Sequence, residues 1–421
     1  MSAAQSDVGR ASVGSGAIGL WTIRLLAIVI FINYVDRGIL STGAPLIKDE
    51  LGLDNTQIWL LLSAFFWTYM PGQLLAGWLS EKISAYRALV LGIAMWSLAT
   101  AATGLVAGFT AIFSLRLILG LGESAALPCS SKILAMHLPP QKLGMANGLI
   151  GAGLALGPAF GSYFGGILMA QSGWRLTFII FGLASLFWLV PWRFATRDSA
   201  VRIDKSAELT ATPSMRVMLR YRELWGACLG HFATNYAFYI VITWLPLYLV
   251  KARGFTITQM AQLSGIIFVI YAASNLVTGW LCDRWMAAGA SITRVRKTFL
   301  IAGHLGSAIC MLICAVGSHD ASIAALLAAA VFFGFNTANI FAVGQTLGGP
   351  TAAGKWIGIQ NCVGNLPGIF APIITGLVVD KTGQFSLAFL IAALVTILGV
   401  LGWGVLIRRV EPIAWPESSA R

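Results

Sequence analysis

The sequence predicts an all-α membrane protein with twelve transmembrane helices in two similar bundles of six. Three observations lead to this prediction: a strongly apolar composition, a series of apolar segments long enough to span a bilayer, and a repeat that relates the two halves of the chain. Each half contains six apolar segments, and one longer polar stretch separates the halves.

The composition excludes an ordinary soluble domain. Of the 421 residues, 57% are hydrophobic and only 10% are charged, and the mean hydropathy is +0.80. Soluble domains carry about 25% charged residues. The six cysteines and four histidines show no metal-ligand spacing, so we expect neither a metal site nor a disulfide framework.

The apolar segments set the expected organisation of the chain. In the first half they fall near residues 19–42, 56–79, 87–107, 109–136, 143–170 and 175–194. In the second half they fall near residues 223–250, 259–282, 297–317, 322–346, 356–379 and 385–407. We therefore predict a tail at 1–18, a bundle at 19–194, a linker at 195–222, a bundle at 223–407 and a tail at 408–421.

The distribution of basic residues predicts the orientation. With both termini in the cytoplasm, 21 of the 28 Lys and Arg residues lie inside, 5 outside and 2 within the apolar segments. Cytoplasmic loops of membrane proteins carry such an excess. The net charge of +12 is thus a sign of topology, and no nucleic-acid partner is needed to explain it. Residues 1–17 lack an apolar core, so we expect no cleavable signal peptide.

The two halves repeat in sequence. At an offset of 202 residues, Asn33 and Tyr34 correspond to Asn235 and Tyr236, and the sequence GWLSEK at 77–82 corresponds to GWLCDR at 279–284. A second offset, 214, relates Gly144 to Gly358, Asn147 to Asn361 and Pro158 to Pro372. Parallel repeats of this kind place a substrate site between the halves, near the middle of the membrane.

Two pairs of charged residues interrupt apolar segments. Arg116 and Glu123 are seven residues apart, which places them on one face of a helix, and Asp36 and Arg37 interrupt the first segment. A charge in the middle of the bilayer costs about 2.5–3.5 kcal/mol, so such residues are functional candidates. The alternative is an ion pair between helices that only stabilises the fold, or an Asp36 that only neutralises Arg37.

These motifs resemble the major facilitator superfamily over nearly the whole chain. Residues 77–82 are similar to its loop between helices 2 and 3, although Ser84 stands where the family usually has glycine, and 173–175 (GWR) resembles the start of its sixth helix. Within the superfamily, the segments 33–37 (NYVDR), 120–123 (GLGE), 235–239 (NYAFY) and 361–368 (NCVGNLPG) resemble the anion:cation symporter family of organic-acid transporters.

The resemblance implies a secondary transporter that imports an organic carboxylate together with protons. The expected substrates are sugar acids, hexuronates, tartrate-like acids or aromatic acids. By resemblance, Arg37 holds the substrate carboxylate, Glu123 and Asp36 carry the coupling proton with Arg116 beside them, and Tyr34, Tyr69 and Asn365 line the pocket. Sugar-acid members often have glutamine in helix 5, where this chain reads GAG at 151–153, so we expect a less hydroxylated or bulkier acid.

Further polar residues are weaker candidates for the substrate site. Tyr239, Asn235, Asn361 and Gln345 are expected to line the cavity, although Asn361 and Asn365 could instead join helices by hydrogen bonds. The loop residues are expected to join helix ends and to gate access on the inner face; they are Gly77, Glu81, Lys82, Arg87, Asp283 and Arg284.

Other functions are less well supported. The glycines at 153, 157 and 161 resemble the helix-5 motif of proton-coupled efflux antiporters, which is the alternative function. A solute sensor would be expected to carry a large soluble domain. An enzyme is not expected, because no phosphate-binding loop or nucleophile–base arrangement is present. We expect no cofactor, a proton gradient as the energy source, and a monomer in the bacterial inner membrane.

Overall fold

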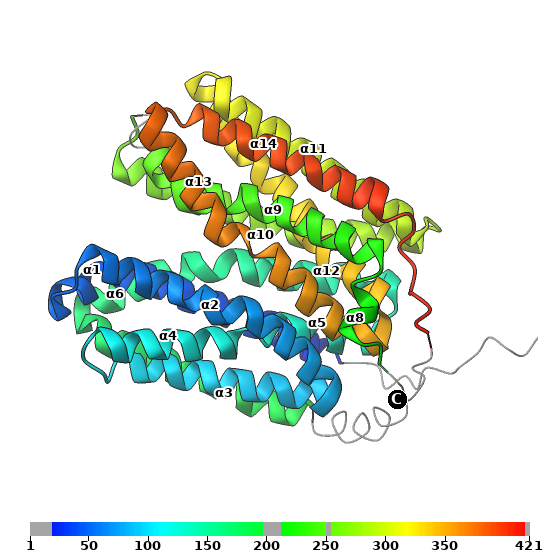
Figure 1. Cartoon of the computed structure of the whole chain (residues 1–421), viewed down its shortest axis with the longest axis horizontal. Helices are drawn as coiled ribbons and strands as arrows, with labels where there is room; N and C mark the ends of the chain where they lie inside the picture. Colours follow the sequence, from blue (N-terminus) through cyan, green and yellow to red (C-terminus); the bar gives the residue numbers. More distant parts are fainter. Residues whose placement is uncertain (1–18, 197–211, 250–253, 417–421) are drawn as a thin grey trace, which may run out of the picture.

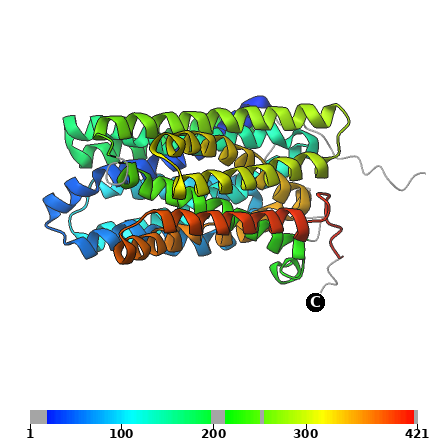
Figure 2. The ribbon, with the colours of Figure 1, turned by 90° about the horizontal axis from the view of Figure 1, so that it is seen from above.

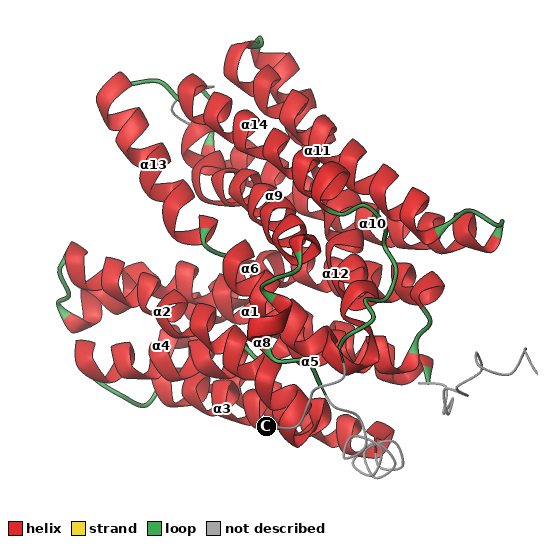
Figure 3. Ribbon diagram, turned by 45° about the vertical axis from the view of Figure 1, so that its right-hand side comes forward, coloured by secondary structure: helices red, strands yellow, loops and turns green. Residues whose placement is uncertain are grey.

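The computed structural model describes residues 19–196, 212–249 and 254–416. Within these ranges the regular elements are all helical, as Figure 3 shows. The predicted tail at 1–18 lies outside the described residues, as do 197–211 of the linker and 417–421 of the second tail.

The first half of the chain forms one group of helices, shown in blue to green in Figure 1. Its elements are α1 (Leu20–Leu51), α2 (Asn55–Leu79), η1 (Ser80–Ser84), α3 (Ala85–Thr103), α4 (Phe109–Glu123), α5 (Ala126–His137), η2 (Pro140–Lys142) and α6 (Leu143–Phe187). Within the group, α1 packs along α6, and α4 packs along α2 and α3.

The second half forms the other group, and the helices of both groups run roughly along one common direction (Figure 2). Its elements are α8 (Met215–Met218), α9 (Arg222–Leu247), α10 (Ile257–Ala287), α11 (Ile292–Val316), α12 (His319–Gly364), α13 (Pro367–Thr382), α14 (Ser386–Leu401) and η4 (Gly402–Leu406). The groups meet where α10 packs on α6 and where α12 packs on α2 and α5.

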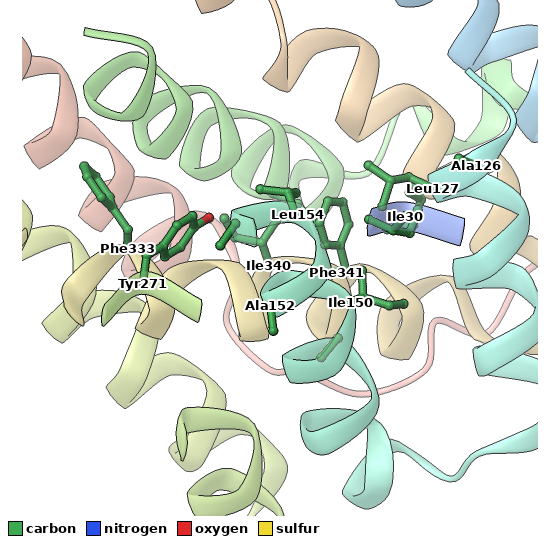
Figure 4. Packing of buried hydrophobic residues seen from close by; sticks show 14 of the residues in the cluster. Ile30, Ala126, Leu127, Ile150, Ala152, Leu154, Tyr271, Phe333, Ile340 and Phe341 are labelled. Atoms are coloured by element: carbon green, nitrogen blue, oxygen red, sulfur yellow. The ribbon is translucent and has the colours of Figure 1, made fainter. Parts of the chain in front are cut away.

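The surface between the two groups is largely apolar. Figure 4 shows side chains from α1, α5 and α6 packed with side chains from α10 and α12. Ile30, Leu127 and Ile150 of the first group and Ile340 and Phe341 of the second are all buried in this cluster. An apolar interior of this kind excludes water from any polar group placed within it.

Seven stretches of the described helices are long and apolar enough to cross a membrane. Some of them cover more than one helix: 56–103 contains α2, η1 and α3, and 140–196 contains η2 and α6. The chain is therefore a multi-pass membrane protein, while the count of twelve crossings stays a prediction.

Two breaks in the helices fall between predicted segments, and two fall inside them. Gly173 lies between the predicted segments 143–170 and 175–194, and Gly349 lies between 322–346 and 356–379. Gly173 and Gly349 interrupt α6 and α12 with φ angles of 77° and 64°, which glycine adopts without a steric penalty. The predicted segment at 109–136 is two helices, because the α4 helix ends at Glu123 and α5 begins at Ala126. The segment at 356–379 is likewise interrupted, between α12 and α13.

Candidate functional site

The Arg37 guanidinium lies against three aromatic rings. Its guanidinium carbon is 4.2 Å from the ring centre of Tyr34 on α1 and 4.8 Å from the ring centres of both Phe65 and Tyr69 on α2. Phe65 and Tyr69 are four residues apart, so their rings stack on one face of α2 with centroids 4.7 Å apart. Aromatic faces attract a cation, and the effect is larger where water is scarce.

Glu123 is the acidic partner of Arg37. An Arg37 Nη atom lies 3.4 Å from a carboxylate oxygen of Glu123, whose side chain is fully buried at the end of α4. The other Glu123 oxygen and the Arg37 Nε atom have no hydrogen-bond partner. An arginine has five N–H donors, so this guanidinium retains the capacity to bind a second carboxylate.

Asp36 and Arg116 make separate contacts. Asp36 points toward α3, where the Thr100 hydroxyl donates a hydrogen bond of 3.3 Å to one carboxylate oxygen, and the other oxygen has no partner. Arg116 Nε donates to the carbonyl of Leu61 at 3.4 Å, and its guanidinium lies 5.3 Å from the Phe65 ring centre. Phe65 thus lies close to both buried arginines.

The contacts show which arginine pairs with Glu123, a choice between Arg37 and Arg116 that the sequence left open. Arg116 and Glu123 share a helix face, yet the short contact of Glu123 is with Arg37 on another helix. As expected from the helical spacing, Asp36 and Arg37 face different neighbours.

The second group of helices supplies the opposite wall of the site. The Tyr239 hydroxyl on α9 donates to the Asn365 Oδ1 atom at 2.9 Å, and the Tyr239 ring lies 6.4 Å from the ring of Phe66 on α2. Asn365 Nδ2 in turn donates to the carbonyl and the side-chain oxygen of Asn361. Asn235 donates to the Gly364 carbonyl at 2.6 Å and so fixes α9 against the break between α12 and α13.

Gln345 lies in a different group of contacts, which joins the two halves. Its side-chain amide and that of Asn147 on α6 exchange hydrogen bonds of 2.7 and 3.0 Å. Gln345 Nε2 also reaches the Ser131 hydroxyl of α5 at 3.1 Å. All three side chains are buried. This amide pair is one of several contacts at what we call the closed end, the end of the molecule where Glu81, Asp283 and Gln345 join the halves.

The predicted loop residues also lie at the closed end. Asp283 on α10 accepts hydrogen bonds of 2.8 Å from the backbone N–H groups of Gly144 and Met145, at the start of α6 in the other half. Asp283 also lies 3.7 Å from a guanidinium nitrogen of Arg296. Carboxylates are stabilised at helix N-termini, so this contact favours closure.

The first copy of the loop makes similar contacts. Glu81 forms an ion pair with Lys132 and lies beside Gly354 of the second half, where an added Cβ atom would be 3.2 Å from Glu81 Oε1. Lys82 lies over the Trp78 ring at 4.5 Å and Arg284 over the Trp280 ring at 5.4 Å, as the repeat of 202 residues requires. Arg87 is exposed on α3.

Glycines allow the halves to touch backbone to backbone. A Cβ atom added to Gly148 would lie 2.6 Å from the Asn275 carbonyl oxygen, and one added to Gly358 would lie 2.5 Å from the Gln73 carbonyl oxygen. Gly77 meets Gly354 in the same way as Gly279 meets Gly144. The matching glycines, 144 with 354 and 148 with 358, are 210 residues apart.

The offset of 214 is therefore wrong for the contacts at the closed end. It pairs Gly144 with Gly358, whereas the observed contacts pair Gly144 with Gly354. An α-helix has 3.6 residues per turn, so a shift of four residues keeps a similar helix face and both registers look plausible from sequence alone.

At the opposite end, the GWR sequence fastens α1 to α6. The Trp174 ring N–H donates to Glu50 at 2.6 Å, and Arg175 Nε donates to the same carboxylate at 2.8 Å. These donors, Arg175 first and Trp174 second, lower the pKa of Glu50, which lies beyond the apolar part of α1. Gly173, which has a positive φ, directly precedes these two residues.

Sequence reasoning missed two residues of the site. Phe65 could have been found, because it lies one helical turn before Tyr69 and shares its face. Thr100 carries no local signal, since the hydrogen bond to Asp36 links positions 64 residues apart. Among the described residues, no group of three His, Cys, Asp or Glu side chains is arranged to hold a metal ion.

Two groups of membrane-spanning helices that meet beside a partly buried guanidinium and are joined at one end are the arrangement expected of a solute transporter. The chain belongs to the Major Facilitator Superfamily, whose family model matches residues 26–293. The family and the relatives are transporters, which confirms the expectation that the chain is not an enzyme.

The chain is similar to several transporters of organic acids. It is 28% identical to a probable sulfoacetate transporter, SauU, of Cupriavidus necator, over 90% of this chain and 91% of that protein. It is 29% identical to a hexuronate transporter of Bacillus subtilis, over 91% and 92% of the two chains. It is 30% identical to a probable L-galactonate transporter of Escherichia coli, over 93% and 90%.

A solved structure shares the fold. The transporter FucP in its outward conformation aligns with a TM-score of 0.68, over 91% of this chain and 97% of that one, at 19% identity.

Proposed function

We propose that this protein imports an organic carboxylate by proton-coupled symport with alternating access. The observation that carries the proposal is the Arg37 guanidinium, which is partly buried, lies 3.4 Å from Glu123 and has an unpartnered donor. The relatives are named as transporters of sulfoacetate, hexuronate and L-galactonate, all of them anions.

In the proposed mechanism, the substrate carboxylate takes the place of Glu123 beside Arg37. A proton on Glu123 removes its charge and frees the guanidinium, so that proton and anion bind together. Tyr34, Tyr69, Tyr239 and Asn365 supply hydroxyl and amide groups around the bound acid. Asp36, hydrogen-bonded to Thr100, is the second carboxyl available to carry a proton.

The proposed topology follows from the basic residues. Twelve crossings with both termini in the cytoplasm place residues 19–194 in one bundle and 223–407 in the other, in a bacterial inner membrane. The closed end then faces the cytoplasm, and the present structure is a state sealed on that side. Transport would proceed by rocking of one bundle against the other, with separation of Gln345 from Asn147 and of Asp283 from the start of α6.

The alternative, an efflux antiporter, was suggested by the glycines of α6. In the structure, α1 packs closely against these glycines. A Cβ on Gly153 would lie 2.7 Å from the Ala27 carbonyl oxygen, and one on Gly157 would lie 2.6 Å from the Tyr34 Cβ. Close packing of α1 on α6 accounts for them, so they do not by themselves favour antiport.

Substitution Glu123→Gln tests the proposal. In proteoliposomes with an imposed pH gradient, the wild type should accumulate one or more acids from a panel of sugar acids and aromatic acids. The variant should exchange the same acid across the membrane without accumulating it, because it cannot release a proton. Glu223→Gln is the control, since Glu223 pairs with its neighbour Arg222 at 3.2 Å. Accumulation driven by pH in the Glu123 variant would refute the assignment.

A further inference from the structure

A small apolar cavity lies within the second group of helices. Its volume is about 70 Å³, and its walls come from α9, α10 and α12. The side chains that line it include Phe238, Leu245, Phe268, Tyr271, Ala330 and Phe333. Figure 4 shows Tyr271 and Phe333 side by side at one end of the packed cluster between the halves.

The cavity offers almost nothing to water. A water molecule needs about 10–15 Å³ of such space, so room is not the limit, but it also needs two to four polar partners. The Tyr271 hydroxyl is already paired with the Thr337 hydroxyl at 2.7 Å, and the Ser264 hydroxyl contacts the Met260 sulfur at 3.9 Å. Apolar cavities of this kind stay dry and accept apolar groups.

The cavity adjoins the proposed substrate site. The Phe238 ring, which lines it, lies 5.9 Å from the ring of Tyr239, whose hydroxyl donates to Asn365 at 2.9 Å. Phe238 thus lies between the apolar cavity and Tyr239 of the proposed site.

The repeat makes the two walls of the site chemically different. Tyr69 of the first half corresponds to Tyr271 of the second, at the offset of 202 residues. Tyr69 lies under the Arg37 guanidinium, whereas Tyr271 packs against Phe238 and Phe333 with ring centroids 5.7 and 6.3 Å away. A substrate bound between these walls would contact a cation on one side and apolar side chains on the other.

We propose that this cavity is a subsite for the apolar end of the substrate. The inference rests on the proposed function and specifies the cargo: a carboxylate that carries a phenyl ring or a short alkyl chain, with its charge at Arg37 and its apolar end beyond Phe238. A fully hydroxylated sugar acid has no apolar end to fill the cavity, and the cavity offers its hydroxyl groups no hydrogen-bond partner.

A series of phenyl acids tests the inference on the full-length protein. The affinities of benzoate, phenylacetate and 3-phenylpropionate are measured by titration calorimetry in detergent and compared with that of glucuronate. Each methylene that enters the cavity should tighten binding about fourfold, until the cavity is full. Glucuronate should bind more weakly than the best phenyl acid.

Two variants change the cavity from opposite sides. Ala330→Leu places a larger side chain in it and should abolish the gain along the series. Phe268→Ala, at a half-buried lining position, should move the optimum to a longer acid and remains informative if the first variant unfolds. Phe299→Ala is the control, because Phe299 packs near Trp285 on α10, away from the cavity.

The outcomes separate this inference from the proposed function. Transport of sugar acids with no gain along the phenyl series would overturn the subsite and leave the proposed function standing. A gain that persists unchanged in both cavity variants would also overturn the subsite. Failure of every organic acid to bind would overturn both.

Discussion

Arg37 is stabilised by three aromatic rings and one carboxylate, not by a network of acids. Tyr34, Phe65 and Tyr69 lie within 4.8 Å of its guanidinium carbon, while the distance to Glu123 is 3.4 Å. Rings stabilise the charge without occupying the in-plane N–H donors. The arginine can therefore remain charged in a dry site and still bind an anion.

Arg37→Lys should show whether the planar fork matters. The substitution retains the charge but loses the bidentate geometry and the stacking on three rings. A hydrogen bond to a charged group contributes about 1.5–3 kcal/mol, so the affinity for the transported acid should fall roughly tenfold to a hundredfold. The measurement is the dissociation constant of the best acid, obtained by calorimetry.

The matched control is Arg284→Lys, because Arg284 also lies over an aromatic ring, that of Trp280, but belongs to the closed end. Its affinity should equal that of the wild type. Equal affinity in the Arg37 variant would contradict a direct contact between Arg37 and the carboxylate.

The sequence located the charged residues of the site but not how they pair. Helical spacing separates Asp36 from Arg37, and the structure agrees. The choice of Glu123 as the partner of Arg37, and of Thr100 as the partner of Asp36, depends on how α1, α3 and α4 pack. Such contacts between distant segments leave no periodic signal in one sequence.

At the scale of helices, the breaks are as informative as the helices themselves. The α4 helix ends at Glu123 and α12 at Gly364, so a polar site residue stands at each interruption. The length of the apolar runs predicted the segments, since a helix needs about 20 apolar residues to span a bilayer. It did not predict the breaks after Glu123 and before Pro367, because the apolar run continues on both sides of the few polar residues there.

The backbone is strained at Ser84, at the junction between η1 and α3. Its φ angle is 103°, and every other described residue with a positive φ is a glycine. The family that the sequence resembles usually has glycine at this position of the loop between helices 2 and 3. Residues in sparsely populated backbone regions cost about 1–3 kcal/mol, so the junction between η1 and α3 should be relieved by removing the Cβ atom.

Ser84→Gly should accordingly stabilise the protein by about 1 kcal/mol, after the greater freedom of glycine in the unfolded chain is subtracted. Thermal unfolding in detergent measures the effect. Ser80→Gly provides the contrast in the same turn, because Ser80 donates a hydrogen bond of 2.8 Å to Gly77 and the protein should be destabilised by its loss. A lower melting temperature for the Ser84 variant would show that its φ is not strained.

At the scale of the whole molecule, the two halves close by matching contacts. Gly148 lies against Asn275 in the same way as Gly358 lies against Gln73. The carboxylates of Asp283 and Glu81 each lie beside a glycine of the opposite half, Gly144 and Gly354. The sequence repeat predicted this symmetry in outline. Its second register was in error by four residues, since periodic small residues fit more than one alignment.

Gly148→Ala and Gly358→Ala should each hold the closed end apart. The added Cβ would meet a carbonyl oxygen at 2.6 or 2.5 Å, which forces backbone to move. We expect both variants to lower uptake several-fold and to increase labelling of a cysteine introduced at Gln345. Gly265→Ala is the control, because no atom lies within 4 Å of the position of its Cβ.

Normal uptake and labelling in both variants would show that the glycine contacts are dispensable. A defect in only one of them would mean that the halves do not contribute equally to closure.

The glycine contacts affect the expected rate of the conformational change that opens the closed end. Where bulky side chains interlock, separation requires many torsions to rearrange together, and each rearrangement adds a barrier. At the closed end, strips of backbone that touch through glycine can part as rigid bodies, so the polar contacts there would set the time needed to open that end. Speed would then be adjustable by changing one amide or carboxyl group, with the architecture left untouched.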